Sequence, residues 1–223
     1  MCFSAEASFA ASAVLCVIGV TGLAGGPLPA ERPLAFVPLL FSAQQFAEGV
    51  VWSGLGTGDR AIVSVFGTAY VYFAFFLWPI YVPLAVLLVE PSARRRRAQE
   101  WLVVVGACAA VFIMGALASG PLLVTETAGH LFYGLDLPLR EESIAIYFVA
   151  VCAPLLSTFG WVRAFGLALV VGLAVALGHF AGDFVSLWCF AAGLASTAIA
   201  FHLRAQREAR RLFGTLPAPS LAR

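Results

Sequence analysis

Seven closely spaced apolar segments dominate this 223-residue chain, and several have the length that a lipid bilayer requires. A bilayer core about 30 Å thick requires about 20 apolar residues per helix, and lipid offers no partners to unpaired backbone groups. The segments lack the alternation and the turn spacing of outer-membrane strands. We therefore predict an all-α fold, a seven-transmembrane helix bundle, with spans at residues 7–25, 34–54, 62–89, 101–119, 143–158, 164–180 and 184–203.

The composition supports this interpretation and excludes two cofactors. Hydrophobic residues make up 61% of the chain and charged residues 11%, which is too apolar for a soluble domain of this length. All 13 basic residues are arginine, because the sequence contains no lysine. Retinal and pyridoxal phosphate are both held as lysine imines, so neither can be a cofactor here.

The arginines predict the orientation. Short loops rich in arginine stay in the cytoplasm, and the run 94–97 marks the loop between the third and fourth spans. With seven spans, the N-terminus then lies outside and the C-terminus in the cytoplasm. Residues 1–203 form one transmembrane domain, and 204–223 form a basic cytoplasmic tail. We expect anionic lipid headgroups, rather than a nucleic acid, to be the partners of these arginine clusters.

The second span carries an unusual polar face. Gln44, Gln45, Glu48 and Trp52 recur at helical spacing, about a third of the way in from the outer surface. Glu48 is the only carboxylate well inside a span. An isolated charge there is costly, so we expect Glu48 to be protonated, hydrogen-bonded, paired with an arginine or bound to a metal.

Further polar residues are predicted to reach the same side of the membrane. His179 and Asp183 flank the junction of the last two spans, His130 and Tyr133 lie in the segment before the fifth span, and Cys2 precedes the first. Imidazoles, carboxylates and a thiol are ligands for zinc or copper, so His130, His179, Asp183 and Cys2 form a candidate metal site. The alternative is a set of hydrogen bonds and caps, because no paired-ligand motif is present.

These residues leave three functions open, and whether the protein is an enzyme is undecided. The first is a metal-dependent hydrolase acting on a lipid-like substrate, with Glu48 or Asp183 as the base. The second is a small-solute or proton-coupled transporter or channel that uses Glu48. The third is a receptor or structural subunit of unknown oligomeric state. The candidate substrate-binding residues are Gln44, Gln45, Trp52, Tyr133 and Trp188.

Four segments resemble an uncharacterised family of small bacterial polytopic membrane proteins. They are the opening Met-Cys-Phe-Ser-Ala, "QQFAEGVVW" in the second span, "GHLFYG" before the fifth and "SLWCFAA" in the last. The resemblance implies a helical bundle in a bacterial inner membrane and carries no mechanism. It directs attention to Cys2, Gln45, Glu48, His130, Tyr133 and Trp188.

Overall fold

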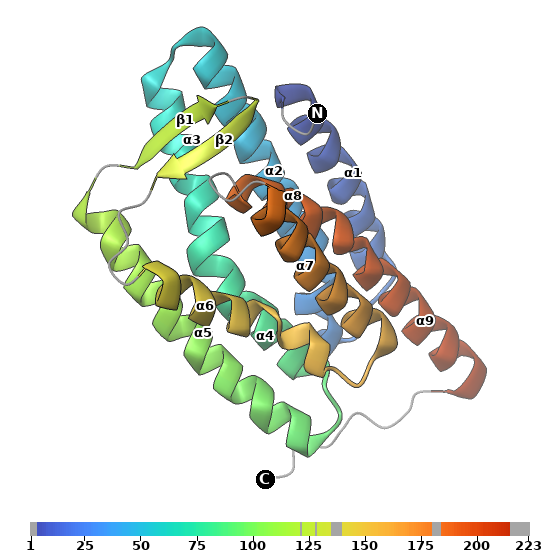
Figure 1. Ribbon diagram of the computed structural model, residues 1–223. Coiled ribbons are helices and arrows are strands. Elements are labelled where there is room, and N and C mark those ends of the chain that lie inside the picture. Colours follow the sequence, from blue (N-terminus) through green and yellow to red (C-terminus); the bar gives the residue numbers. More distant parts are fainter. Residues whose placement is uncertain (1–3, 121, 128, 135–139, 180–183, 215–223) are drawn as a thin grey trace.

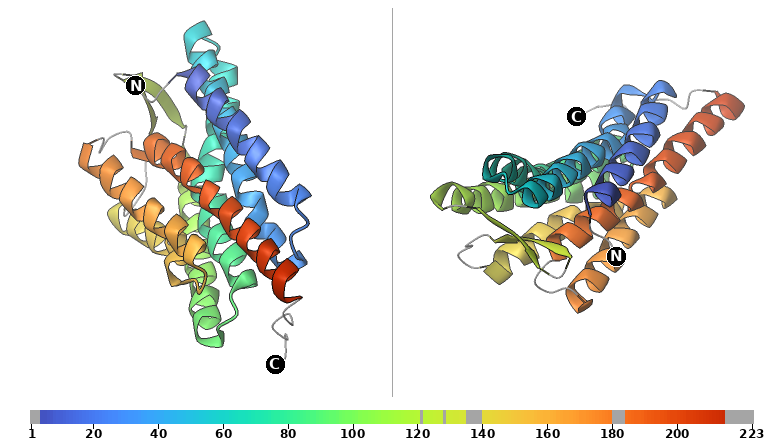
Figure 2. Two further views of the ribbon diagram at one scale, coloured as in Figure 1. Left: turned by 90° about the vertical axis from the view of Figure 1, so that its right-hand side faces the viewer. Right: turned by 90° about the horizontal axis from the view of Figure 1, so that it is seen from above.

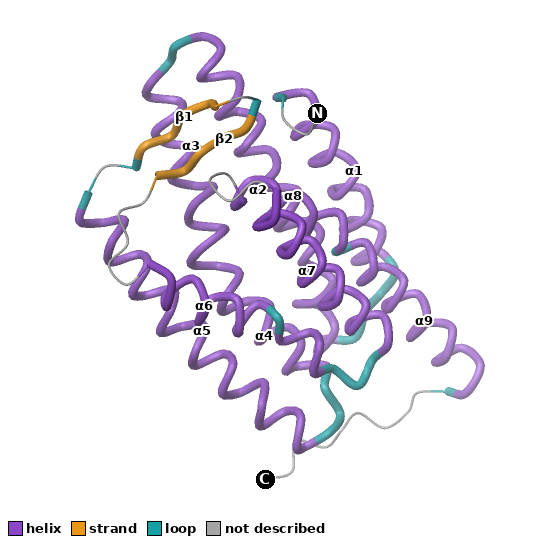
Figure 3. The backbone as a smooth tube through the Cα atoms, viewed as in Figure 1, coloured by secondary structure: helices purple, strands orange, loops and turns teal. Residues whose placement is uncertain are grey.

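The computed structural model describes residues 4–120, 122–127, 129–134, 140–179 and 184–214. In these ranges the chain forms a bundle of helices with one small sheet (Figures 1 and 3). The helices are α1 (Ala5–Ala24), α2 (Arg32–Thr57), α3 (Arg60–Tyr72), α4 (Trp78–Val89), α5 (Ala93–Ser119), α6 (Arg140–Val151), α7 (Gly160–His179), α8 (Phe184–Ala195) and α9 (Thr197–Phe213). Short turns connect them: the 3-10 turns η1 (Pro29–Glu31) and η3 (Ala153–Leu156), and the π-turn η2 (Phe73–Leu77).

Six helical segments in the described ranges are long and apolar enough to cross a membrane. They are Ala5–Ala24, Pro29–Thr57, Arg60–Val89, Ala93–Gly115, Gly160–Gly178 and Val185–Phe213. The prediction of an all-α bundle is confirmed by these elements. The predicted fifth span, 143–158, has a different form, because α6 has only 12 residues and ends at Val151. Pro154 explains this end: it lacks an N–H group, and its ring clashes with the carbonyl four residues earlier.

The bundle has two distinct ends (Figures 1 and 2). At the end that we call the arginine end, α1 terminates, α2 and α5 begin, and α9 terminates. The other end, which we call the hairpin end, contains the start of α1, the turn between α2 and α3, and the small sheet. Arg32 at the start of α2, the arginine run at the start of α5 and the basic end of α9 therefore share one end, as the predicted orientation requires.

The long third segment contains a π-turn. Residues Phe73–Leu77 form this turn immediately before Trp78 and Pro79. Pro79 cannot donate the hydrogen bond that a regular helix needs here, and π-turns commonly absorb such interruptions. The backbone after this turn lies against α5, where a Cβ added to Gly106 would lie 1.8 Å from the Pro79 carbonyl oxygen. Only glycine fits at this contact.

The polar segment before α6 contains a β-hairpin, which the sequence analysis did not predict. Strands β1 (Leu123–Thr127) and β2 (His130–Gly134) pair antiparallel, with Leu123 opposite Gly134 and Thr127 opposite His130. Leu131 and Tyr133 of β2 are buried, so one face of the hairpin packs onto the bundle. Gly67 of α3 allows this approach, since its added Cβ would lie 2.9 Å from the Val124 side chain.

Candidate functional site

The polar face of α2 is buried in the bundle. Gln44, Gln45 and Glu48 have no exposed surface, and Trp52 is 9% exposed. All four side chains lie in α2 and are buried, as expected for residues on one helix face. Their burial means that every polar atom needs a polar partner inside the bundle, because neither lipid nor apolar side chains can provide one.

The Glu48 carboxyl group is hydrogen-bonded to a residue of α8. The Ser186 hydroxyl of α8 donates a hydrogen bond of 2.5 Å to Glu48 Oε1. Gln45 and Tyr70 also lie close enough to interact with the carboxyl group. The second oxygen, Oε2, has no hydrogen-bond partner among the described residues. Glu48 therefore has one fixed oxygen and one oxygen with unused acceptor capacity.

Two stacked tyrosines connect this carboxyl group to the hairpin. The rings of Tyr70 in α3 and Tyr133 in β2 are nearly parallel, with centroids 4.6 Å apart. Both side chains are buried. Burial, with Glu48 nearby, raises the pKa of the Tyr133 phenol well above its usual range. Tyr133 therefore remains a neutral hydroxyl, and the hairpin places near Glu48 a side chain that can donate or accept a hydrogen bond.

Several buried polar atoms in this region have no hydrogen-bond partner in the described part of the chain. We call the surrounding residues the Glu48 centre: Gln45, Glu48, Trp52, Tyr70, Tyr133 and Ser186. The unpaired atoms are both amide atoms of Gln45, Glu48 Oε2, Trp52 Nε1 and the hydroxyls of Tyr70 and Tyr133. Such groups are rare in native proteins and commonly mark a place where water, an ion or a ligand binds.

Two of the predicted substrate-binding residues are already engaged in packing. Trp78 Nε1 donates a 2.7 Å hydrogen bond to Gln44 Oε1, which ties α4 to α2. Trp188 Nε1 donates to the Leu169 carbonyl oxygen of α7 at 3.0 Å. The Trp188 ring also packs edge-to-face against Tyr147 of α6. These contacts give Gln44 and Trp188 a supporting position beside the centre, although Gln44 Nε2 has no hydrogen-bond partner among the described residues. Gln45, Trp52 and Tyr133 belong to the centre.

The candidate metal site falls largely outside the described residues. Cys2 and Asp183 are not described, and neither is the His179 side chain at the end of α7. His130 is described and is the first residue of β2. Successive residues of a strand face opposite sides, so His130 lies on the face opposite to the buried Leu131 and Tyr133. No group of three potential metal ligands occurs among the described side chains, and the metal site stays a prediction.

Sequence analysis missed two members of the centre, Tyr70 and Ser186. Tyr70 belongs to an aromatic run that is typical of a membrane interface, and Ser186 lies in an aromatic stretch of the last span. A serine inside an apolar span is a weak signal, because its hydroxyl commonly bonds to its own helix backbone. Only the packing of α8 against α2 identifies Ser186 as the partner of Glu48.

The centre has defined chemical abilities. The hydroxyls, the indole N–H and the amide can donate hydrogen bonds, while Glu48 Oε2 and Gln45 Oε1 can accept them. No arginine forms an ion pair with Glu48 in the described ranges. A carboxyl group in this setting can exchange a proton or bind a small polar or cationic solute.

These features define a polytopic helical bundle with a buried polar centre beneath a β-hairpin. The chain belongs to a family of unknown function (DUF6629), whose model matches residues 1–213. The predicted resemblance to an uncharacterised family is thereby confirmed. No curated protein and no solved structure shows significant similarity to the chain.

Proposed function

We propose that the protein is a membrane carrier that binds a small polar solute at the Glu48 centre and couples its movement to proton exchange at Glu48. The observation that supports this function is the buried carboxyl group with one unpaired oxygen among other unpaired polar atoms. Four separate segments contribute to the centre: α2, α3, β2 and α8. Relative movement of these segments would change both its hydrogen bonding and its access to water.

The hairpin provides the outer barrier in this proposal. Tyr133 and Leu131 of β2 are buried against the bundle, so in this proposal β2 closes the centre toward the hairpin end. Displacement of the hairpin would break the contact between the Tyr70 and Tyr133 rings and expose Glu48 from that side. Carriers require such a barrier, because a centre open to both sides would dissipate the gradient that drives transport.

The proposal includes a seventh crossing of the membrane. Helix α6 has 12 residues, about 18 Å at 1.5 Å per residue, and the four residues of η3 add about 8 Å. Their sum of roughly 26 Å approaches the thickness of the hydrocarbon core. With seven crossings and the arginine end in the cytoplasm of a bacterial inner membrane, the hairpin lies outside. A fluorescent protein fused after Arg223 should then fluoresce, and an alkaline phosphatase fused there should be inactive.

Proton movement into vesicles tests the carrier function. Purified protein is reconstituted into vesicles that contain a pH-sensitive dye, and an inside-negative potassium diffusion potential is applied with and without small polar solutes outside. We expect faster acidification than in protein-free vesicles, and we expect Glu48→Gln to abolish the difference. Glu126→Gln, an exposed carboxyl change on β1, is the matched control and should behave as the wild type.

Two results would contradict the carrier proposal. One is acidification that is no faster with the wild-type protein than without it under every solute condition. The other is an unchanged rate in Glu48→Gln. In either case the metal content of protein purified without chelators becomes the decisive measurement, because the hydrolase hypothesis requires bound zinc or copper that is lost in His130→Ala.

A further inference from the structure

A groove about 500 Å³ in volume runs between α1 and α9 at the arginine end. Thr21 and Gly22 of α1 form one side, and Arg204, Arg207 and Arg211 of α9 lie along the other. Because the arginines recur at intervals of three and four residues, they share one face of α9. The groove therefore combines positive charge with a wall of small residues.

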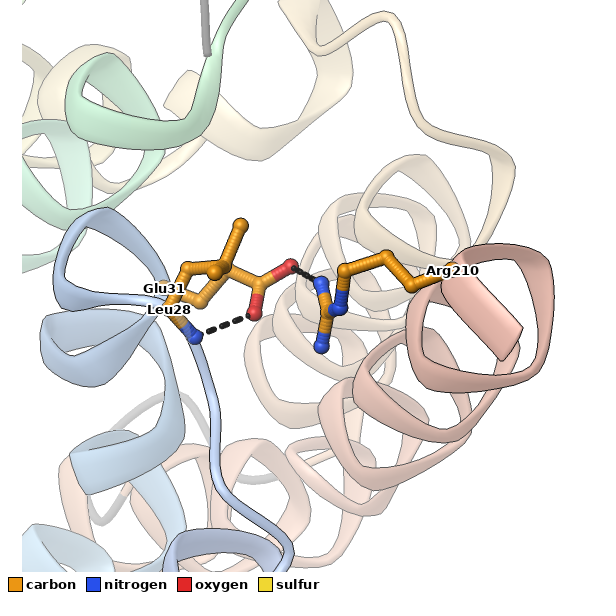
Figure 4. A network of polar contacts seen from close by, with 3 residues as sticks. All are labelled: Leu28, Glu31 and Arg210. Atoms are coloured by element: carbon orange, nitrogen blue, oxygen red, sulfur yellow. Dashed lines mark hydrogen bonds and ion pairs between the residues drawn. The ribbon is translucent and has the colours of Figure 1, made fainter. Parts of the chain in front are cut away.

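The ion pairs of α9 divide its arginines into two groups. Arg210 donates a 2.7 Å hydrogen bond to Glu31, whose other oxygen accepts from the Leu28 N–H at 2.8 Å (Figure 4). Arg204 pairs with Glu208 one turn along the same helix. In the described part of the chain, no ion pair joins Arg207 or Arg211 to a carboxylate. The groove thus presents two uncompensated positive charges.

The Arg207 side chain occupies a space that Gly25, the residue after α1, leaves open. A Cβ added to Gly25 would lie 1.2 Å from Arg207 Nη2, so the guanidinium group occupies the space over this glycine. Gly25 has a φ of −67°, an ordinary helical value that any residue can adopt. The glycine is therefore needed for the position of Arg207 and not for the local backbone.

Exposed apolar side chains border the same arginines. Phe201 is 52% exposed, Leu212 76% and Phe213 78%. Large apolar side chains beside arginines at the end of a membrane helix are typical of the region where acyl chains meet headgroups. A phospholipid in the groove can place its acyl chains against these side chains, whereas a soluble anion can contact only the arginines.

We propose that the α1–α9 groove binds the headgroup of an anionic phospholipid from the leaflet at the arginine end. Arg207 and Arg211 contact the phosphate, and the acyl chains lie against Phe201 and the exposed end of α9. The bound lipid would hold α9 against α1, next to the contact between Arg210 and Glu31. This site is independent of the proposed carrier function, since it lies at the end of the bundle opposite to the hairpin.

Native mass spectrometry of the full-length protein in a non-ionic detergent tests the site. The protein is titrated with phosphatidylglycerol, and separately with phosphatidylcholine of the same acyl chains. We expect tighter binding of the first phosphatidylglycerol molecule. Each arginine near a phosphate contributes about fivefold, so Arg207→Gln with Arg211→Gln should weaken this binding roughly thirtyfold.

Two further variants distinguish lipid binding in the groove from a diffuse electrostatic attraction to the arginine end. Arg94→Gln with Arg97→Gln removes the same charge from exposed positions at the same end and should leave the first binding constant unchanged. Gly25→Ala keeps every charge but displaces the Arg207 guanidinium, and it should weaken binding several-fold. Glycerol phosphate added in excess should not displace the lipid, because it lacks the chains.

The proposal is overturned by any of three results. Equal loss of binding in the two double arginine variants would indicate a diffuse charge effect. Wild-type binding by Gly25→Ala would show that the position of Arg207 is unimportant. Displacement by glycerol phosphate would identify a soluble anion as the ligand.

Discussion

Three buried glutamates, two at the arginine end and one nearer the hairpin end, differ in their hydrogen bonds. At the arginine end, Glu90 accepts hydrogen bonds from the Ser92 N–H, the Thr158 N–H and the Thr158 hydroxyl. Glu31 accepts from the Leu28 N–H and from Arg210. Toward the hairpin end, Glu48 accepts a hydrogen bond from Ser186 at one oxygen, and its other oxygen has no hydrogen-bond partner among the described residues. Burial alone therefore does not distinguish these carboxyl groups, but their hydrogen bonds do.

The difference separates structural roles from a functional one. Glu90 connects the end of α4 to the turn before α7, and Glu31 connects the start of α2 to the end of α9. Each carboxyl group contributes stability through contacts with segments distant in sequence. A carboxyl group with unused capacity inside a span costs stability, so its presence at position 48 requires another explanation, and ligand or proton binding provides one.

The largest effect in this comparison is expected for Glu90→Ala. The change removes the buried acceptor of three hydrogen bonds, two of them from Thr158, and should lower the free energy of unfolding by about 3 kcal/mol, at about 1 kcal/mol per bond. Thermal unfolding in detergent, followed by circular dichroism, measures it. Glu100→Ala removes an exposed carboxyl group at the same end and should change stability little. Similar losses in the two variants would refute a structural role for the Glu90 contacts.

Arg210→Gln should have the next largest effect. Its ion pair with Glu31 is largely buried, with side-chain exposures of 18% and 9%, so its loss should cost about 1–2 kcal/mol in the same assay. Arg204→Gln breaks the pair with Glu208, which is 78% and 58% exposed, and should cost under about 0.5 kcal/mol. An equal loss in the free energy of unfolding for Arg204→Gln and Arg210→Gln would contradict this difference between the exposed and the buried ion pair.

Glu48→Gln should change the free energy of unfolding by less than about 1 kcal/mol while abolishing proton movement. Glutamine has nearly the same shape, and its carbonyl oxygen can still accept from the Ser186 hydroxyl. Unfolding in detergent and acidification of vesicles are measured on the same preparation. A stability loss as large as that of Glu90→Ala would place Glu48 among the structural carboxyl groups.

Tyr133→Phe should have the smallest effect on stability, within about 0.5 kcal/mol. The hydroxyl has no hydrogen-bond partner in the described chain, and the substituted ring can still stack on Tyr70. Because the phenol is neutral, no charge is removed. Tyr133→Ala, which deletes the stacked ring, should cost about 3 kcal/mol. If both changes were equally harmful, the hydroxyl itself would have to contribute to folding.

Local pattern was sufficient to predict most helices and part of the centre. The length of the apolar runs predicts the spans, because lipid requires a minimum helix length whatever the packing. Helical periodicity also placed Gln45, Glu48 and Trp52 on one face. The hairpin was missed although its signals are present: two segments rich in β-branched or aromatic residues are separated by two residues, and Gly129 has a φ of +79°.

The amino-acid sequence by itself determined the helical segments, their polar face and the sharing of one end by the arginine clusters, since each depends on helix geometry and on the properties of lipid. The tertiary structure alone decided which polar groups meet. Ser186 lies 138 residues from Glu48 in the chain, and Arg210 lies 179 residues from Glu31. Contacts over such separations depend on how whole helices pack, and no local pattern encodes that. The same packing left one oxygen of Glu48 unpaired and both oxygens of Glu31 bonded.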